Sequence, residues 1–372
     1  MSNAKGPGTL AERPKTARGG LARAARFVAR RLPPPRDKAL LRLGVAARDL
    51  MTGRAPQRFA SQTATRGEPV IGPPPPRPAP QVKESDITWR TPPPLANTGI
   101  PIHSIYNTGP APPKFDVELL EKLNAEYADK PLVPQAPKYD AESLTRNGRR
   151  RTLWVHNMVD LAAKRTLEIG CGNGYEVWHV GEHLAADAYG VDVTEYGPWE
   201  ALASDRVHFA CADMTVDNPY SEDFFDRIMS FTVWEHVLHP YKLLEETYRV
   251  LKPGGLAWIN ANLYPGPRAS HRYRDIYFPW PHLLFTDDVI KEWDRKNGKE
   301  ERGSAWVNRL SWYHYQYYFD RLGFRIRHLH FTQMPIDEDF YQRFEDILGR
   351  FPRWDLTKDF FLAVVEKPAE PA

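Results

Sequence analysis

The stretch TLEIGCGNGYEV, residues 166–177, places three glycines within five positions directly after a short apolar run. Glycine weakens the interior of a strand or helix, so Gly170, Gly172 and Gly174 need a physical reason. Glycines that follow a strand usually let the backbone approach a ligand closely. The stretch therefore predicts a buried strand that ends in a ligand-binding loop.

Four further strand-like runs follow the glycine loop, and polar or helical segments separate them. They read DAYGVDV, VHFACAD, DRIMSFT and GLAWINAN and lie within residues 187–262. Strands that alternate with helical segments indicate an α/β fold with a parallel sheet and helices on both faces. In such a sheet, ligands lie beyond the carboxyl ends of the strands, where the glycine loop is expected.

The net charge of +3 is unevenly distributed along the 372 residues. Residues 1–66 carry a formal charge of about +12 and the rest about −9, counted from Lys, Arg, Asp and Glu. A mildly acidic remainder argues against a nucleic-acid partner held by the fold itself. Any contact with a polyanion, a membrane surface or an acidic partner is expected to come from the basic N-terminal part.

Three parts are expected: a tail at residues 1–85, an N-terminal extension at 86–140 and an α/β domain at 141–368. The tail is rich in Pro, Arg and Ala, which is typical of a disordered segment. Two stretches within it, 20–32 and 37–51, are alternatively helices that dock on a membrane surface or on a protein. An organellar transit peptide is a third interpretation of the tail.

Helices are expected at residues 116–129 and 141–163, the second with an interruption at 147–148, where Asn precedes Gly. No run approaches the roughly 20 apolar residues of a membrane span, and the N-terminus lacks the apolar core of a secretory signal. We therefore expect a soluble, cytoplasmic protein, at most peripheral at the inner membrane surface. Cys171 and Cys211 end apolar runs and are expected to be small buried residues in a reducing compartment.

Two acidic residues extend the ligand-binding pattern. The loop reads G-x-G-x-G, which differs from the dinucleotide pattern G-x-G-x-x-G. Asp192 ends the second strand 22 residues after Gly170, where a carboxylate can accept both hydroxyls of a ribose. Asp213 ends the third strand and can accept a hydrogen bond from an adenine amino group, with Met214 beside the ring.

Five pieces now stand in order: LEIGCGNG, GVDV, CADM, FDRIMSFTVWEHVLHP and LLEETYRVLKPGG. In this order and spacing, residues 166–263 resemble a class I S-adenosylmethionine-dependent methyltransferase of the small-molecule, methyltransferase type 11-like kind. The resemblance implies a Rossmann-like seven-stranded sheet in the order 3-2-1-4-5-7-6, with an antiparallel last strand. Residues 324–331 and 359–367 supply the sixth and seventh strands.

The resemblance also implies S-adenosyl-L-methionine as the cofactor. The residues that it assigns to the cofactor are Glu168, Gly170, Gly172, Gly174, Asp192, Asp213, Met214 and Ser230. The glycines and Glu168 shape the loop beside the methionine moiety, and Ser230 lies by the methionyl group and the sulfonium. Cys171 is expected to pack rather than react. A disulfide to Cys211 is not expected, because two strand spacings of about 4.8 Å separate their strands.

Glu235 and His236, just after the fourth strand, are the candidates that act on the methyl acceptor. A hydroxyl acceptor needs a group that removes its proton, and such catalysis contributes roughly 10²–10⁴-fold. The alternative for His236 is packing at a helix start. A histidine and carboxylate metal site stays open, although no ligand spacing predicts one.

An aromatic-rich insertion separates the fifth and sixth strands and covers residues 262–293 and 306–324. It is expected either to form a lid that stacks on a sugar or encloses an aromatic acceptor, or to pack over the sheet edge. Thr286 before two acids predicts a helix N-cap. The residues in the insertion that could touch substrate are His271, Asp275, His282 and His314.

We therefore expect an enzyme that methylates an oxygen of a saccharide or another small polar metabolite. Quinone-like or lipid acceptors come second. A catalytically inactive scaffold with the same fold is a further alternative, although intact ribose and adenine acids disfavour it. A nicotinamide oxidoreductase is disfavoured by the G-x-G-x-G loop. The sequence leaves the oligomeric state open.

Overall fold

The computed structural model describes residues 115–133, 140–184, 187–304 and 307–369, which all belong to one compact unit, Gly72–Ala372. The tail at 1–85 and the first part of the extension lie outside the described residues. The interpretations of the tail, its surface contacts and the cytoplasmic location therefore stay predictions.

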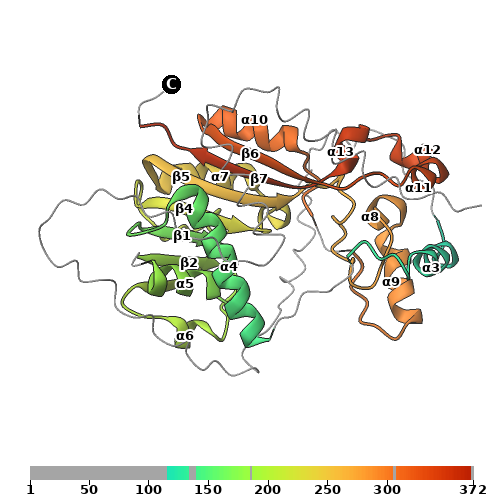
Figure 1. The fold of residues 1–372 in the computed structure, drawn as a ribbon, viewed down its shortest axis with the longest axis horizontal. Coiled ribbons are helices and arrows are strands. Elements are labelled where there is room, and N and C mark those ends of the chain that lie inside the picture. The colour runs from blue at the N-terminus through green and yellow to red at the C-terminus, as the bar shows by residue number, and fades with distance from the viewer. Residues whose placement is uncertain (1–114, 134–139, 185–186, 305–306, 370–372) are drawn as a thin grey trace, which may run out of the picture. The chain divides into compact units, whose positions relative to one another are not determined.

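Seven strands form one sheet in the order β3-β2-β1-β4-β5-β7-β6, which confirms the expected topology (Figure 1). Neighbours from β3 to β5 are parallel, whereas β7 runs antiparallel to both β5 and β6. The strands are β1 (Thr166–Ile169), β2 (Ala188–Asp192), β3 (Val207–Cys211), β4 (Phe225–Phe231), β5 (Leu251–Asn262), β6 (Arg325–Gln333) and β7 (Lys358–Glu366).

Helices connect and cover the strands. They are α3 (Val117–Glu126), α4 (Ala141–Val159), α5 (Tyr175–His183), α6 (Trp199–Leu202), the 3-10 helix η3 (Trp234–His236), α7 (Pro240–Val250), α8 (Pro281–Leu284), α9 (Asp287–Lys296), α10 (Trp312–Leu322), α11 (Glu338–Arg343), α12 (Glu345–Leu348) and α13 (Arg353–Thr357). Within the described ranges, none of these helices has the length and apolar character needed to cross a bilayer.

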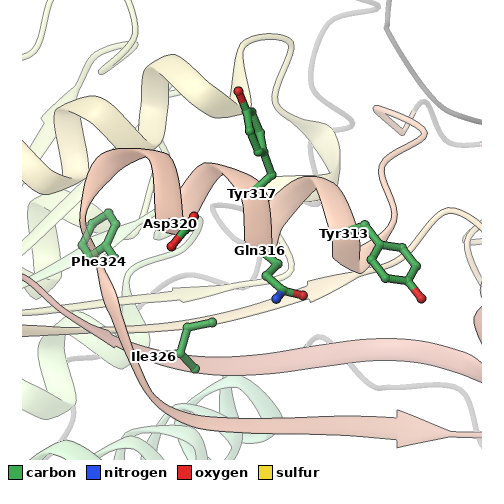
Figure 2. A pocket seen from close by; sticks show the side chains of 6 residues that line it. All are labelled: Tyr313, Gln316, Tyr317, Asp320, Phe324 and Ile326. Carbon is green, nitrogen blue, oxygen red and sulfur yellow. The ribbon is translucent and has the colours of Figure 1, made fainter.

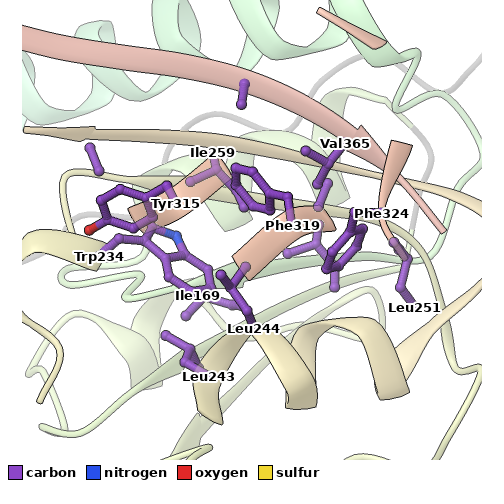
Figure 3. Close-up of a cluster of buried hydrophobic side chains, with 14 of the residues drawn as sticks. Ile169, Trp234, Leu243, Leu244, Leu251, Ile259, Tyr315, Phe319, Phe324 and Val365 are labelled. Atoms are coloured by element: carbon purple, nitrogen blue, oxygen red, sulfur yellow. The ribbon is translucent and has the colours of Figure 1, made fainter. Parts of the chain in front are cut away.

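The two faces of the sheet bury different side chains, because successive residues of a strand point to opposite sides. On β5, Ile259 joins a core with helices α7 and α10, whereas Trp258 joins a core with α4 and α5. Figure 3 shows the first core, which includes Tyr315 and Phe319 of α10 and Leu244 of α7. The expected α/β arrangement with helices on both faces is therefore confirmed.

The aromatic insertion forms a second core with the helix before the domain. Phe278, Trp280 and Trp293 are each at most 4% exposed and pack with Leu120 of α3 and Phe340 of α11. Figure 1 shows α3, α8, α9, α11 and α12 gathered together at one side of the sheet. These rings therefore serve packing, the second of the two interpretations, and are not available to stack on a sugar.

Three local predictions are confirmed only in part. Helix α4 continues through Gly148, because the missing side chain there lets α4 lie against Tyr175 of α5: an added Cβ would come within 3.1 Å of that residue. Thr286 precedes α9 as expected, but its side chain makes no capping hydrogen bond. Cys171 is buried as expected, whereas Cys211 is exposed, because β3 is the edge strand of the sheet.

A buried ionic network holds the insertion together. Arg272 is 5% exposed and donates hydrogen bonds to Asp294, to Asp275 and to the carbonyl of Gly303. Asp294 is fully buried on α9, and Lys299 donates to Asp275 over 3.2 Å. The guanidinium is thus compensated from three segments of the insertion.

Asp294→Ala should lower the free energy of unfolding by roughly 3–5 kcal/mol, because it leaves the buried Arg272 guanidinium without its main partner. Chemical denaturation measures this change. Arg295 lies on the same helix as Asp294 and makes an exposed ion pair with Glu301, so Arg295→Ala is the control and should change stability little. Equal effects of the two substitutions would contradict the role given to the network.

Candidate active site

The three loop glycines have different structural roles. All three have positive φ: 71° at Gly170, 48° at Gly172 and 82° at Gly174. A Cβ on Gly170 would lie 2.2 Å from Val233 Cγ2, and one on Gly174 would lie 2.5 Å from the Phe209 ring. A Cβ on Gly172 would meet no atom within 4 Å. Two glycines are therefore required by packing, and the third leaves open space above its backbone.

The peptide of Gly172 is held from both sides. Its amide donates to Asp192 Oδ2 over 3.0 Å, and its carbonyl accepts from Trp199 Nε1 over 2.7 Å. The Trp199 ring in turn stacks on Phe209 with a centroid separation of 5.1 Å. Sequence reasoning missed Trp199, because a single tryptophan in a polar segment carries no spacing signal.

Asp192 lies at the carboxyl end of β2, as expected. Its carboxylate accepts from the amides of Gly172 and Thr194, at 3.0 and 3.2 Å. Burial raises the pKa of Asp192 above its usual value, and these backbone amides offset the shift only in part. A ligand that adds hydroxyl donors would complete the solvation of this carboxylate.

Glu168 sits in the middle of the sheet on β1 and is 3% exposed. Burial, and next the neighbouring Glu176, raise its pKa well above the usual range for a carboxyl group. Its Oε2 atom is buried without a hydrogen-bond partner. A buried polar atom left unpaired is costly, so this atom marks a place that a polar ligand group would satisfy.

Asp213 and Met214 follow β3, which ends two residues before Asp213. Asp213 is exposed, and its Oδ1 accepts from both the amide and the hydroxyl of Thr215, at 2.8 and 2.7 Å. The carboxylate therefore caps a turn, and both bonds go to one of its oxygens. The Met214 side chain is 4% exposed and packs in the core beside β1 and β4. Their contact with adenine stays a prediction.

Ser230 is fully buried in β4, and its hydroxyl donates to the carbonyl of Ile169 over 2.9 Å. This bond ties β4 to the last residue of β1, directly before the glycine loop. The hydroxyl thus stabilises the strand that carries the loop. Its predicted place beside the methionyl group is not tested by this contact.

The turn after β4 carries Glu235 and His236 on η3. It approaches the glycine loop through Val233, the residue that packs against Gly170. Asn308 of the insertion fixes the turn, because its side chain donates to the carbonyl of Trp234 over 2.7 Å and its amide donates to that of Glu235 over 2.8 Å. Sequence reasoning missed Asn308, which stands alone in an irregular segment.

His271 of the insertion joins this pair. Its Nε2 lies 4.0 Å from Glu235 Oε1, and its ring meets the His236 ring edge-on with centroids 4.7 Å apart. Glu235 is 1% exposed, and neither carboxylate oxygen accepts a well-formed hydrogen bond. Burial raises the pKa of Glu235 to about 8, with a small opposing effect from nearby backbone amides. Burial and then the neighbouring His236 lower the pKa of His271 to about 3.

The other candidates in the insertion are engaged elsewhere. Asp275 belongs to the network around Arg272. His282 Nε2 lies 2.8 Å from the carbonyl of Tyr264, and burial lowers the pKa of this ring to about 4. His314 Nδ1 accepts from the amide of Ser311 at the start of α10. The structure therefore brings His271 to Glu235 and His236, and it does not bring the other three.

A separate surface hollow lies between α10 and β6. Its lining residues are Tyr313, Gln316, Tyr317, Asp320, Phe324 and Ile326. Figure 2 shows Tyr317 pointing away from the sheet, while Gln316 points toward Ile326 on β6. None of the candidate site residues lines this hollow.

Comparison with known proteins agrees with the sheet and the loop. Residues 167–259 match the family model described as a methyltransferase domain. The chain contains a class I S-adenosylmethionine-dependent methyltransferase domain. Over 130 residues, the chain is 35% identical to a demethylmenaquinone methyltransferase of Clavibacter sepedonicus, covering 34% of this chain and 53% of that protein.

A ubiquinone biosynthesis O-methyltransferase of Pseudomonas aeruginosa is 27% identical to this chain over 179 residues, covering 40% of this chain and 70% of that protein. Among solved structures, an S-adenosylmethionine-dependent methyltransferase from Mesorhizobium loti aligns with a TM-score of 0.41 at 19% identity, covering 60% of this chain and 99% of that one. The chain spans about half the length of the demethylmenaquinone methyltransferase from Clavibacter sepedonicus.

The residues present fit S-adenosylmethionine. Gly172 offers uncovered backbone, Asp192 offers a carboxylate that lacks donors other than amides, and Glu168 offers an unpaired buried oxygen. These groups lie at the carboxyl ends of β1 and β2 or beside them, where the parallel sheet is expected to bind a ligand. The loop, Asp192 and Glu168 are thus suited to the methionine and ribose parts of this cofactor.

Gly172→Ala should abolish most cofactor binding and lower stability only by the roughly 1–2 kcal/mol of an alanine at positive φ. Gly174→Ala should cost more stability, because a clash with Phe209 adds roughly 1–3 kcal/mol. Calorimetry with S-adenosylhomocysteine and thermal unfolding separate the two effects. Normal binding by Gly172→Ala would mean that the open space above Gly172 is not the ligand site.

Asp192→Ala should weaken S-adenosylhomocysteine binding about 10- to 100-fold, because it removes hydrogen bonds to a charged group worth roughly 1.5–3 kcal/mol. The fold should persist. Asp187→Ala, directly before the first residue of the same strand, is the matched control and should bind normally. An unchanged affinity in the Asp192 variant would remove this carboxylate from the ribose site.

Proposed function

We propose that the protein transfers a methyl group from S-adenosylmethionine to an oxygen of a small polar metabolite, with a saccharide as the first acceptor class. The observation that carries the proposal is the group of Glu235, His236 and His271 beside the cofactor loop. Val233 connects this group with the loop, because it lies two residues before Glu235 and packs against Gly170. Groups that accept a proton therefore stand on the turn next to the loop.

S-adenosylmethionine, when bound, supplies a methyl group activated on a sulfonium. The residues of the chain hold the partners in line, which can contribute roughly 7–11 kcal/mol to lowering a barrier. The hydrogen-bonded Gly172 peptide and Asp192 hold the cofactor. The turn at η3, which Asn308 fixes by a hydrogen bond, places His236 next to the methyl acceptor. The acceptor hydroxyl gives up its proton to the imidazole of His236.

The acceptor class rests on the polarity of this group and on the named relatives. Two histidines and a carboxylate suit a hydroxyl acceptor, because its proton must be removed as the methyl group is transferred. The Pseudomonas relative is named for O-methylation in ubiquinone biosynthesis. A quinol hydroxyl is therefore the second acceptor class, and the experiment separates it from a saccharide.

The test is transfer of labelled methyl from S-adenosylmethionine to metabolite extracts separated into polar and lipid fractions. Label in the polar fraction that is stable as a methyl ether supports the saccharide class, and label in the lipid fraction supports a quinol. The absence of transfer to any fraction, despite cofactor binding, would support a scaffold protein instead.

His236→Ala should lower turnover of the labelled acceptor at least about 100-fold while S-adenosylhomocysteine affinity stays within about twofold. His239→Ala, an exposed histidine three residues further on, is the control and should retain activity. Near-normal turnover by a folded His236 variant would exclude this imidazole from the mechanism.

A further inference from the structure

The side chains of Glu235, His236 and His271 form a group with the chemistry of a metal site. One ligand atom from each lies within 4.8 Å of the others. Around a cation with bonds of about 2.1 Å, ligand atoms lie about 3.0–3.4 Å apart. The three atoms therefore need to move inward by about 1 Å, which side-chain rotation can supply.

Two of these side chains carry polar atoms that no protein group satisfies. Glu235 is 1% exposed, and both of its carboxylate oxygens are without a hydrogen-bond partner. His271 Nε2, 4.0 Å from one of these oxygens, is also buried and unpaired. Burying a carboxylate without partners is costly, and the usual remedies are an ion pair or a metal. Because Glu235 Oε1 and His271 Nε2 lie 4.0 Å apart, one occupant between them would satisfy both residues.

The backbone holds the group at some energetic cost. His271 has a φ of 56°, and Thr232, which leads from β4 into the turn, has a φ of 54°. Left-handed backbone is strained for residues other than glycine, and such strain concentrates at functional sites. Asn308 adds two hydrogen bonds that fix the carbonyls of Trp234 and Glu235. The strained backbone and the Asn308 hydrogen bonds both belong to the segments that carry Glu235, His236 and His271.

We propose that Glu235, His236 and His271 bind one divalent transition-metal cation. Two imidazoles and one carboxylate suit Zn²⁺, Mn²⁺, Fe²⁺ or Co²⁺, whereas Mg²⁺ and Ca²⁺ prefer sets made only of oxygens. Three protein ligands leave coordination positions open for water or for an oxygen of another molecule. Cation binding itself does not depend on the proposed methyl transfer and is measured without cofactor or acceptor.

The experiment titrates Co²⁺ into the full, untagged chain after chelator treatment and follows visible d–d absorption. One equivalent is expected to bind saturably, and excess Zn²⁺ is expected to displace it. Thermal unfolding gives a second measurement, since a ligand that binds only the folded state raises the melting temperature. Weak absorption without saturation would overturn the proposal.

Glu235→Gln and His271→Gln are each expected to weaken Co²⁺ binding at least about 100-fold, because the loss of a residue that only supports a ligand already costs about 10–100-fold. Glu235→Gln should still fold, since the amide has the size of the carboxyl group and carries no charge, and its melting temperature should no longer respond to Co²⁺. His239→Gln is the control for binding at exposed histidines and should behave as the natural chain. Unchanged binding in Glu235→Gln and His271→Gln would assign the cation to another place and overturn the site.

If Co²⁺ binds but no extract is methylated, the metal site stands and the proposed function fails. If methyl transfer proceeds equally in the chelator-treated chain and no Co²⁺ binds, the function stands and the metal site fails. The two proposals are thus separated by measurements that share no readout.

Discussion

The contact between Val233 and the bare backbone of Gly170 sets the spacing of the whole site. Because β1 and β4 are neighbours in the sheet, the loops that leave them must pass each other at the same edge. A side chain on Gly170 would collide with Val233, so the two loops approach as closely as backbone permits. The cofactor loop and the turn that bears Glu235 and His236 therefore have little freedom to separate.

The parts of the fold that follow from local pattern were predictable. The glycines mark their loop by composition, Asp192 by its distance from the loop, and the strands by short apolar runs between helical segments. The order of the sheet came with the resemblance of five such pieces. Each of these signals lies within a few residues or at a fixed spacing, so it is visible in the chain itself.

The parts of the site that depend on the insertion were less predictable. His271 meets Glu235 across 36 positions in sequence, and Asn308 reaches the same turn from still further along. No periodicity marks either contact. The aromatic residues of the insertion left two interpretations open for a related reason. A buried tryptophan such as Trp280 and a ligand-stacking tryptophan cannot be distinguished by residue type, and the Phe340 ring against which Trp280 packs lies in α11.

The unequal burial of the two thiols leaves one cysteine accessible to a thiol-reactive label. Cys171 is enclosed, and burial raises the pKa of its thiol well above the usual range, so it resists alkylation and oxidation. Cys211 is exposed at the end of β3, two residues before Asp213. A thiol-reactive fluorophore would therefore mark a single place, beside the acid assigned to adenine, without any engineered cysteine.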